Sequence, residues 1–441
     1  MSFWCRTAVT SEGAQHRVRV GVDSLRRISS VQAGTDPAPD DLVLDTVLPA
    51  PANTHSHCFH RALRGRTHGG GGTFWTWRDE MYALAGRLDP ERYERLATAV
   101  FAEMLVSGWT AVGEFHYVHH QPDGTPYPGS AMERAVASAA RSVGIRLTLL
   151  DTCYLRGGAD RPLSPEQVPF SDGDADAYLR RWHALRDAIP DDVVLGAAVH
   201  SVRAVPEKSI AALVRGLPAD IPLHVHVSEQ VRENDECLQE YGCSPTELLA
   251  RAGALTPNAS VVHATHVSPR DIRVLADTGA TAVFCPTTEA DLGDGIGPAR
   301  ALADAGVPLA LGSDQNAVVD PFLEARGLEA GERLSAQQRG RFAPAELLTA
   351  LTSDGRASLG LRPAALRVGD DADVVELRSG SLRTLGSRPE QILLSATASD
   401  VAAVLVGGRL VARDGLLVGA ADGSTSDPAL LLRDALAEVL P

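Results

Sequence analysis

The chain has 441 residues, a formal net charge of -15 and 44% hydrophobic residues. This composition is close to the globular average and excludes wholesale disorder, while the length allows two or three domains or one large barrel with an accessory module. No run of 18 apolar residues is present, which excludes a membrane-spanning helix, and the acidic balance argues against binding to nucleic-acid phosphates.

The N-terminal residues and the cysteines indicate the cellular compartment of the protein. The first residues lack the apolar core of a signal peptide. The six cysteines are scattered without a C-x-x-C pair, so they favour neither a disulfide framework nor a zinc ribbon. Free thiols in a chain of this length are typical of a reducing environment, and we expect a cytoplasmic protein.

Short strands separated by turns are predicted for residues 1–48. Residues 16–22 alternate with a period of two, and residues 33–37 form a turn cluster that contains Gly and Pro. We interpret this segment as one half of a small β domain.

Residues 362–422 also contain short predicted strands separated by turns. Residues 373–377 are a predicted strand, and 401–412 is typical of a hairpin that turns at Gly407 and Gly408. We therefore predict a composite β-sandwich domain built from both termini, followed by a terminal helix over 427–441.

The middle of the chain, residues 49–361, alternates short apolar runs with amphipathic helical stretches. Helical periodicity is clear over 90–105 and 132–142. Eight such alternations over about 300 residues predict a (β/α)8 barrel. The predicted strands are 47–52, 109–115, 147–153, 194–200, 223–227, 260–263, 282–285 and 309–312.

Metal-binding residue types follow four of these strands, at the barrel end where active sites lie. His55 and His57 follow the first strand, and residues i and i+2 of extended backbone share a face. The fifth strand ends in His224 and His226, with Glu229 just beyond it.

The sixth and eighth strands continue the pattern. The sixth is followed by His263 and His266, and the eighth by Asp314. A core histidine or a helix-capping aspartate explains any one of these residues. Neither explains why all of them fall at strand ends, so the sequence predicts a metal site.

Several imidazoles with one carboxylate suit Zn²⁺, with Fe²⁺ as a close alternative, and leave a position for water. A bound divalent cation lowers the pKa of water to about 7, so hydroxide is available at neutral pH. Glu229 is then placed to move a proton from that water to the leaving group. A surface salt bridge is the alternative role for Glu229.

These motifs resemble the aminohydrolase (deaminase) branch of the amidohydrolase superfamily. That branch carries H-x-H after strand 1, His-x-x-Glu after strand 5, His after strand 6 and Asp after strand 8. The resemblance implies a catalytic role for three residues. Glu229 would act as acid and base, His263 would polarise the attacked carbon, and Asp314 would orient the hydroxide. The metal ligands that it implies are His55, His57, His226 and Asp314.

The basic residues bear on the number of metal ions. Of the 41 basic residues, all but Lys208 are arginine. Two-metal members of the superfamily use a carboxylated lysine at the end of strand 4, whereas Lys208 lies eight residues beyond His200, where a helix is predicted to begin. We therefore expect one metal ion.

Two sequence segments restrict the resemblance to one family within this branch. FWTWR at 74–78 and GEFHYVHH at 113–120 are similar to the formimidoylglutamate deiminase family, and the match covers most of the chain. It implies hydrolysis of N-formimino-L-glutamate, a small dicarboxylate, to N-formyl-L-glutamate and ammonia in histidine degradation. It also implies a homodimer, with neither nucleic acid nor a membrane as partner.

The resemblance assigns substrate carboxylates to His200, Arg203, Tyr117 and Arg78. The planar fork of arginine suits bidentate carboxylate binding. A loop salt bridge is the alternative for Arg78, and packing against the cavity wall is the alternative for Tyr117. Members of the family commonly carry, at the position of His60, a Gln that contacts the substrate. Histidine titrates near pH 6.5, unlike glutamine, so His60 need not have the same role as that Gln.

Two other functions remain open at this point. A guanine-type or adenosine-type deaminase needs the same metal ligands but a cavity built for a purine. A catalytically silent scaffold would have lost a ligand or the Glu, and every motif residue is present in this sequence.

Overall fold

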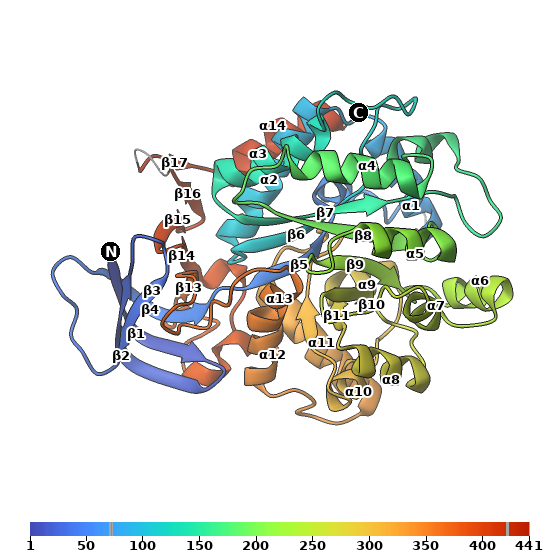
Figure 1. Ribbon diagram of the computed structural model, residues 1–441. Coiled ribbons are helices and arrows are strands. Elements are labelled where there is room, and N and C mark those ends of the chain that lie inside the picture. The colour runs from blue at the N-terminus through green and yellow to red at the C-terminus, as the bar shows by residue number, and fades with distance from the viewer. Residues whose placement is uncertain (70–71, 73, 420–422, 441) are drawn as a thin grey trace.

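The computed structural model describes residues 1–69, 72, 74–419 and 423–440. Its described strands form two sheets, one of eight parallel strands and one of nine mixed strands. Figure 1 shows the smaller module beside the barrel, with both chain-terminal segments contributing to it. The predicted fold class, a barrel with a separate β domain from both termini, is confirmed.

The barrel strands follow one another in chain order, and each pairs in parallel with the next. The first and last strands meet through a bridge between Ser56 and Asp314, and the Asp314 backbone N–H donates to the His55 carbonyl at 2.9 Å. The strands are β5 (Ala52–Ser56), β6 (Ala111–His116), β7 (Arg146–Cys153), β8 (Val194–Ser201), β9 (Leu223–Val227), β10 (Ala259–His263), β11 (Thr281–Phe284) and β12 (Leu309–Leu311).

The first predicted barrel strand is wrong in its bounds. Residues 47–52 straddle the end of β4 (Leu42–Pro49), which belongs to the other sheet, and the first residue of β5. Pro49 and Pro51 lack the N–H that a continuous strand would donate, so the chain leaves one sheet before it enters the next. The other seven predicted strands lie within one or two residues of those observed.

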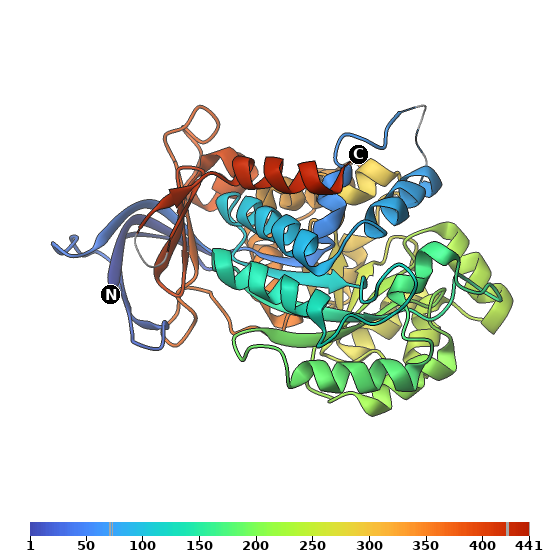
Figure 2. The ribbon, with the colours of Figure 1, turned by 90° about the horizontal axis from the view of Figure 1, so that it is seen from above.

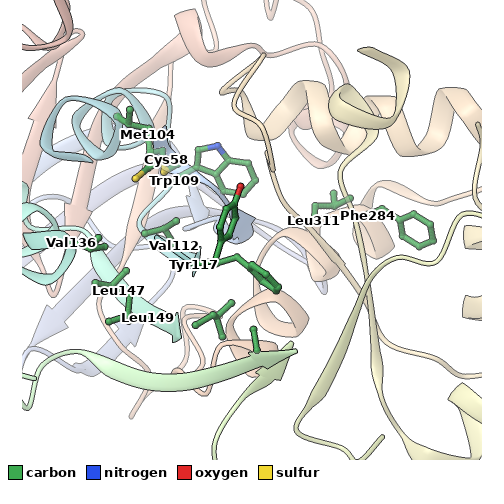
Figure 3. Close-up of a cluster of buried hydrophobic side chains, with 14 of the residues drawn as sticks. Cys58, Met104, Trp109, Val112, Tyr117, Val136, Leu147, Leu149, Phe284 and Leu311 are labelled. Atoms are coloured by element: carbon green, nitrogen blue, oxygen red, sulfur yellow. The ribbon is translucent and has the colours of Figure 1, made fainter. Parts of the chain in front are cut away.

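Helices cover the outside of the barrel. Figure 3 shows how α2, α3 and strands β6 and β7 bury their side chains together, with Met104, Val112, Val136 and Leu147 in one cluster. The helices are α1 (Phe74–Ala85), α2 (Pro90–Val106), α3 (Ala131–Val143), α4 (Ala175–Arg186), α5 (Glu207–Gly216), α6 (Val231–Tyr241), α7 (Pro245–Arg251), α8 (Pro269–Thr278), α9 (Pro286–Leu292), α10 (Ala299–Asp304), α11 (Pro321–Ala336), α12 (Pro344–Leu351), α13 (Ser353–Ser358) and α14 (Pro428–Val439). Short 3-10 helices are η1 (Cys58–Leu63), η2 (Pro165–Phe170), η3 (Pro389–Leu394) and η4 (Ala398–Asp400).

The nine strands of the accessory domain form one hydrogen-bonded sheet. Strand β4 joins its two halves, because it pairs in parallel with β1 and antiparallel with β13. The helix α14 leaves this sheet and packs on α2, as Figure 2 shows from above. The remaining strands are β1 (Ser2–Thr10), β2 (Gly13–Val22), β3 (Ile28–Gln32), β13 (Val374–Leu377), β14 (Val401–Val406), β15 (Arg409–Arg413), β16 (Leu416–Val418) and β17 (Thr425–Ser426).

In the part of the chain that the structure describes, no helix is long and apolar enough to cross a membrane. All six cysteines are buried and carry free thiols. The cysteines, which are scattered along the sequence, form no disulfide among the described residues.

A buried ion network connects the barrel to the accessory sheet. Arg356, on α13, is fully buried and contacts Asp371 at 2.6 Å and Asp373 at 2.9 Å. Arg146, at the start of β7, also contacts Asp373 at 2.6 Å. The two aspartates directly precede β13, so the network holds the C-terminal half of the sheet against the barrel floor.

Replacing Arg356 with Met is expected to destabilise the protein. The change keeps most of the side-chain volume but leaves Asp371 and Asp373 short of positive charge, and breaking a buried ion pair costs about 3 kcal/mol. The denaturant midpoint should fall, with Arg388→Met, at an exposed arginine, as the control. Equal midpoints for both variants would contradict this role.

Candidate functional site

Five side chains converge at the C-terminal ends of the barrel strands. His55 lies on β5 and His57 just after it, His226 on β9, His263 at the end of β10 and Asp314 beyond β12. Every one of them is more than nine-tenths buried. The structure therefore brings together five of the residues that the strand-end pattern singled out.

Ring nitrogens and a carboxylate oxygen meet at one point. His55 Nε2 lies 3.0 Å from His226 Nε2 and 3.4 Å from Asp314 Oδ1, and His57 Nε2 lies 3.4 Å from the same oxygen. His55, His57 and His226 form one group whose ligand atoms lie within 4.8 Å of one another, and His55, His263 and Asp314 form a second. This is a buried, histidine-rich group able to hold a metal ion.

Backbone carbonyls orient two of the imidazoles. His57 Nδ1 donates to the Phe115 carbonyl at 2.9 Å, and His226 Nδ1 donates to the His200 carbonyl at 2.8 Å. A neutral ring that donates from Nδ1 carries a lone pair on Nε2. Burial lowers the pKa of both rings, so both are neutral and present lone pairs to the same small volume. A cation satisfies such an arrangement.

Asp314 is ionised at this site. Burial raises its pKa, but the hydrogen bond and charge of His55, together with His263 and His57, outweigh burial and hold the pKa well below its ordinary value. Its backbone is left-handed, with φ of +44°, as is that of Ser228 at +52° and His263 at +73°. Such backbone costs free energy for residues other than Gly and gathers at functional sites.

Glu229 faces the same point from the loop after β9. Its Oε1 lies 3.9 Å from His263 Nε2, and its side chain is 10% exposed. Burial lowers the pKa of His263, but Glu229, Glu289 and Asp314 outweigh it and raise the pKa to about 10. His263 Nδ1 contacts Glu289 at 3.4 Å, which leaves Nε2 aimed at Glu229 and Asp314 as a charged donor.

His60 and Tyr117 form one side of the cavity beside His57. His60 Nε2 is hydrogen-bonded to the Tyr117 hydroxyl at 2.8 Å, and the His60 ring lies 4.6 Å from that of His57. Burial lowers the pKa of His60 to about 3, so the ring is neutral. A hydrogen-bonding side chain thus stands where the family carries Gln.

His200, near the end of β8, and Arg203, just after β8, also line the cavity. The Arg203 guanidinium lies 3.9 Å from Glu229 and 4.0 Å from Glu233, which is fully buried on α6. Burial, Arg203 and Arg78 together lower the pKa of His200 well below its ordinary value. His200 is therefore a neutral hydrogen-bonding group beside two positive charges.

Arg78 reaches the cavity from α1. The run FWTWR opens this helix, and the side chains of Phe74 and Trp75 lie outside the described residues. Arg78 lies over the ring of Tyr82, with its guanidinium carbon 5.2 Å from the ring centroid, and both line the cavity. Trp77 is buried and closes the cavity beside His60.

Several cavity residues carry no sequence motif. Tyr154, Phe170 and Tyr82 line the same cavity as His57 and Arg203, and Gln167 hydrogen-bonds two of them from behind. A Ser-Pro-Glu-Gln segment at 164–167 is a capping-box signal for a helix start. That signal locates a turn but says nothing about its distance from the barrel mouth.

The His116–His120 run belongs to a second cluster, behind the barrel wall. His116, His119 and Glu133 have ligand types and spacing suitable for a metal, but the Arg181 guanidinium lies 3.2 Å from Glu133 and 2.8 Å from Asp151. His119 contacts Glu133 through Nδ1 at 2.8 Å and the Thr152 carbonyl through Nε2 at 2.8 Å. These residues form an ion network that supports the loop carrying Tyr117.

Two further histidines and the lysine lie away from the site. His224 Nε2 donates to the Ser358 carbonyl at 2.9 Å, one layer deeper in the barrel, and His266 Nε2 donates to the Asp294 carbonyl at 2.8 Å. Lys208 is exposed in the first turn of α5. The end of β8 carries His200 and Ser201 instead.

Comparisons with known proteins agree with this geometry. The model of the Amidohydrolase family matches residues 46–411. Formimidoylglutamate deiminase of Pseudomonas aeruginosa is 35% identical over 436 residues, which cover 95% of this chain and 96% of that protein. The 8-oxoguanine deaminase of the same organism is 29% identical over 437 residues, 94% of this chain and 95% of that protein.

Solved structures are similar over the whole chain. An amidohydrolase from Brucella melitensis superposes with a TM-score of 0.90 at 31% identity and covers 100% of both chains. An adenosine deaminase from Xanthomonas campestris, solved with bound zinc, has a TM-score of 0.84 at 23% identity and covers 99% of this chain and 97% of its own.

Proposed function

The chain belongs to the amidohydrolase family, and from that premise we propose that it hydrolyses N-formimino-L-glutamate to N-formyl-L-glutamate and ammonia, as in histidine degradation. One observation carries the proposal: two arginines, Arg78 and Arg203, line the same cavity as the histidine cluster. A dianionic amidine needs positive charge for its carboxylates and a hydrolytic centre for its formimino carbon, and this cavity has both. The formimidoylglutamate deiminase of P. aeruginosa, 35% identical, supports the same substrate.

The donor set fits a single divalent cation, most suitably Zn²⁺, with Fe²⁺ as the alternative. His55, His57 and His226 would supply imidazole nitrogens and Asp314 a carboxylate oxygen, a combination that both ions accept. When bound, the cation supplies hydroxide at neutral pH by lowering the pKa of water to about 7.

Glu229 moves the proton in this mechanism. Its carboxylate faces His263 across 3.9 Å and is nearly buried, so a proton taken from water stays close to the substrate nitrogen. Delivery of that proton to the imine nitrogen leaves an amino group on the attacked carbon. Transfer of the hydroxyl proton of this adduct to the same nitrogen then breaks the C–N bond, so that ammonia leaves and the formyl carbonyl remains.

His263 and Asp314 act on either side of the attacked carbon. His263 Nε2 lies 3.9 Å from Glu229 and 3.8 Å from Asp314, and a hydrogen-bond donor at this position stabilises the negative charge that develops during attack. Asp314 stays ionised and orients the nucleophile toward the carbon.

One substrate carboxylate would bind at His200 and Arg203, and the other at Arg78 and Tyr117, with His60 as a further substrate contact. The net charge of -15 does not oppose this, because a buried guanidinium dominates the field inside a cavity. His60 and Tyr117 share a hydrogen bond, so together they present one donor and replace the Gln of the family.

Deamination of a purine is the alternative function. It is favoured by the 8-oxoguanine deaminase of P. aeruginosa, which is 29% identical over almost the whole chain. Aromatic side chains such as Tyr154 and Phe170 also line the cavity. A neutral ring, however, offers no carboxylate to Arg78 and Arg203, the two arginines that line the cavity together with the histidine cluster, and this disfavours the alternative.

Ammonia release by the zinc-loaded enzyme separates the two functions. N-formimino-L-glutamate, guanine, 8-oxoguanine and adenosine are compared at equal concentration. We expect turnover of N-formimino-L-glutamate and little turnover of the purines. Turnover of a purine alone would overturn the proposed substrate and retain the family chemistry.

Replacing Arg203 with Met is expected to weaken recognition of N-formimino-L-glutamate. Loss of a charge-assisted hydrogen bond lowers kcat/KM roughly 10- to 100-fold, mainly through KM. Steady-state kinetics measure this, and Arg215→Met, at an exposed arginine of α5, is the matched control. An unchanged KM in the Arg203 variant would remove this residue from carboxylate binding.

A further inference from the structure

A buried glutamine lies directly behind the cavity wall. Gln167, in η2, is 2% exposed, and its Oε1 accepts a hydrogen bond from the Ser164 backbone N–H at 2.9 Å. That contact identifies the oxygen of the amide, because a backbone N–H only donates. The amide nitrogen therefore faces the other way, 2.7 Å from the Tyr154 hydroxyl and 2.8 Å from the Tyr82 hydroxyl.

These contacts determine the direction of the phenol protons. Gln167 gives one amide proton to each phenol oxygen, so neither Tyr82 nor Tyr154 can donate its own proton to Gln167. Those protons remain for the neighbouring phenol and for an acceptor in the cavity that both tyrosines line. A carboxylate is the acceptor that two such donors favour.

The same two tyrosines contact residues that would bind the substrate carboxylates. The Tyr154 ring packs edge-on against His200, with centroids 4.5 Å apart. The Tyr82 ring lies under the Arg78 guanidinium at 5.2 Å. Tyr82 belongs to α1, Tyr154 follows β7 and Gln167 belongs to η2, so one amide joins three segments of the cavity wall.

We propose that Gln167 is a positioning residue for dicarboxylate recognition. Its amide holds the paired Tyr82 and Tyr154 hydroxyls so that a phenol proton is directed at a substrate carboxylate, and through the same two rings it keeps Arg78 and His200 in place. The inference rests on the proposed function, because it names how that cavity selects an anion. Gln167 lies behind the tyrosines and takes no part in the chemical step.

Exchange of Gln167 for Glu tests the proposal at constant shape. The carboxylate accepts where the amide donated, so both phenols turn their protons toward residue 167 and their lone pairs toward the substrate. We expect KM for N-formimino-L-glutamate and Kd for N-formyl-L-glutamate, measured by calorimetry, to rise about tenfold, the size of one charge-assisted hydrogen bond. The kcat value should change by less than about twofold, because this bond forms equally in the ground and transition states.

Gln391→Glu is the matched control, since Gln391 is an exposed glutamine in another 3-10 helix, η3. Tyr154→Phe and Tyr82→Phe remove only a hydroxyl and cover the case in which Gln167→Glu does not fold. We expect each to raise KM, and we expect Gln167→Glu to have a smaller effect in the Tyr154→Phe background. Unchanged KM in both Phe variants, or a loss of kcat at constant KM in Gln167→Glu, would overturn the proposal.

The experiment separates this inference from the proposed function. If the wild-type enzyme binds N-formyl-L-glutamate but does not hydrolyse N-formimino-L-glutamate, the proposed function fails, and the change in Kd on Gln167→Glu still decides the role of Gln167. If the wild-type enzyme hydrolyses the substrate and Gln167→Glu leaves KM and Kd unchanged, the inference fails alone. A wild-type enzyme that neither binds nor hydrolyses overturns both.

Discussion

Glu229→Gln is expected to abolish most turnover while the cation content of the protein stays the same. The substitution keeps the shape of a side chain that is nearly buried between His263 and Arg203. It removes the group that accepts and returns a proton, and such groups contribute about 100- to 10,000-fold to rate. Ammonia release and metal analysis of the same preparation measure the two quantities.

The matched control is Glu390→Gln, at an exposed glutamate of η3. It should retain wild-type turnover and cation content. Retained activity in Glu229→Gln would show that another group moves the proton. Loss of the cation together with activity would instead place Glu229 among the metal ligands.

Removal of the cation by a chelator is expected to abolish turnover and to lower the melting temperature. The stripped site leaves His226 Nε2 facing His55 Nε2 at 3.0 Å and the Asp314 carboxylate without its main counter-charge. A ligand that binds only the folded state at 100 times its Kd stabilises that state by about 2.7 kcal/mol. Zinc re-addition should restore both properties at about one ion per chain, because the chain has one lysine and it lies away from β8.

A pair of histidine variants tests the same site without a chelator. His226→Asn should lose the cation and turnover, whereas His16→Asn, at an exposed histidine of β2, should keep both. Two ions per chain, or a His226 variant with normal metal content, would contradict the ligand set. The homodimer implied by the resemblance remains a prediction, and a measurement of molar mass in solution tests it.

Local patterns were sufficient for most of the barrel. Buried parallel strands are short apolar runs between amphipathic helices, and both signals depend on neighbours in sequence. The run 223–227 coincides with β9, and the hairpin at 401–412 coincides with β14 and β15. The prediction was wrong where two strands of different sheets follow each other without a helix, at β4 and β5.

The candidate metal residues were also predictable, for a topological reason. Parallel strands of a closed barrel end at the same rim, so residues that follow different strands meet without any further information. His55, His226 and Asp314 are far apart in sequence, yet their position relative to a strand end is a local property. The orientation of each ring was not predictable, since His57 and His226 are held by carbonyls of the adjacent strands β6 and β8.

Local sequence patterns were thus enough to predict the barrel, the family resemblance and the strand-end histidines with Glu229 and Asp314. The other residues that reach this site became apparent only in the folded chain. Gln167, Tyr82 and Tyr154 lie on three separate segments, and Arg356 on α13 contacts Asp371 and Asp373, which precede β13 of the accessory sheet. Such contacts arise from the packing of loops and helices on the barrel, and no period or spacing in a single chain encodes the distance between them.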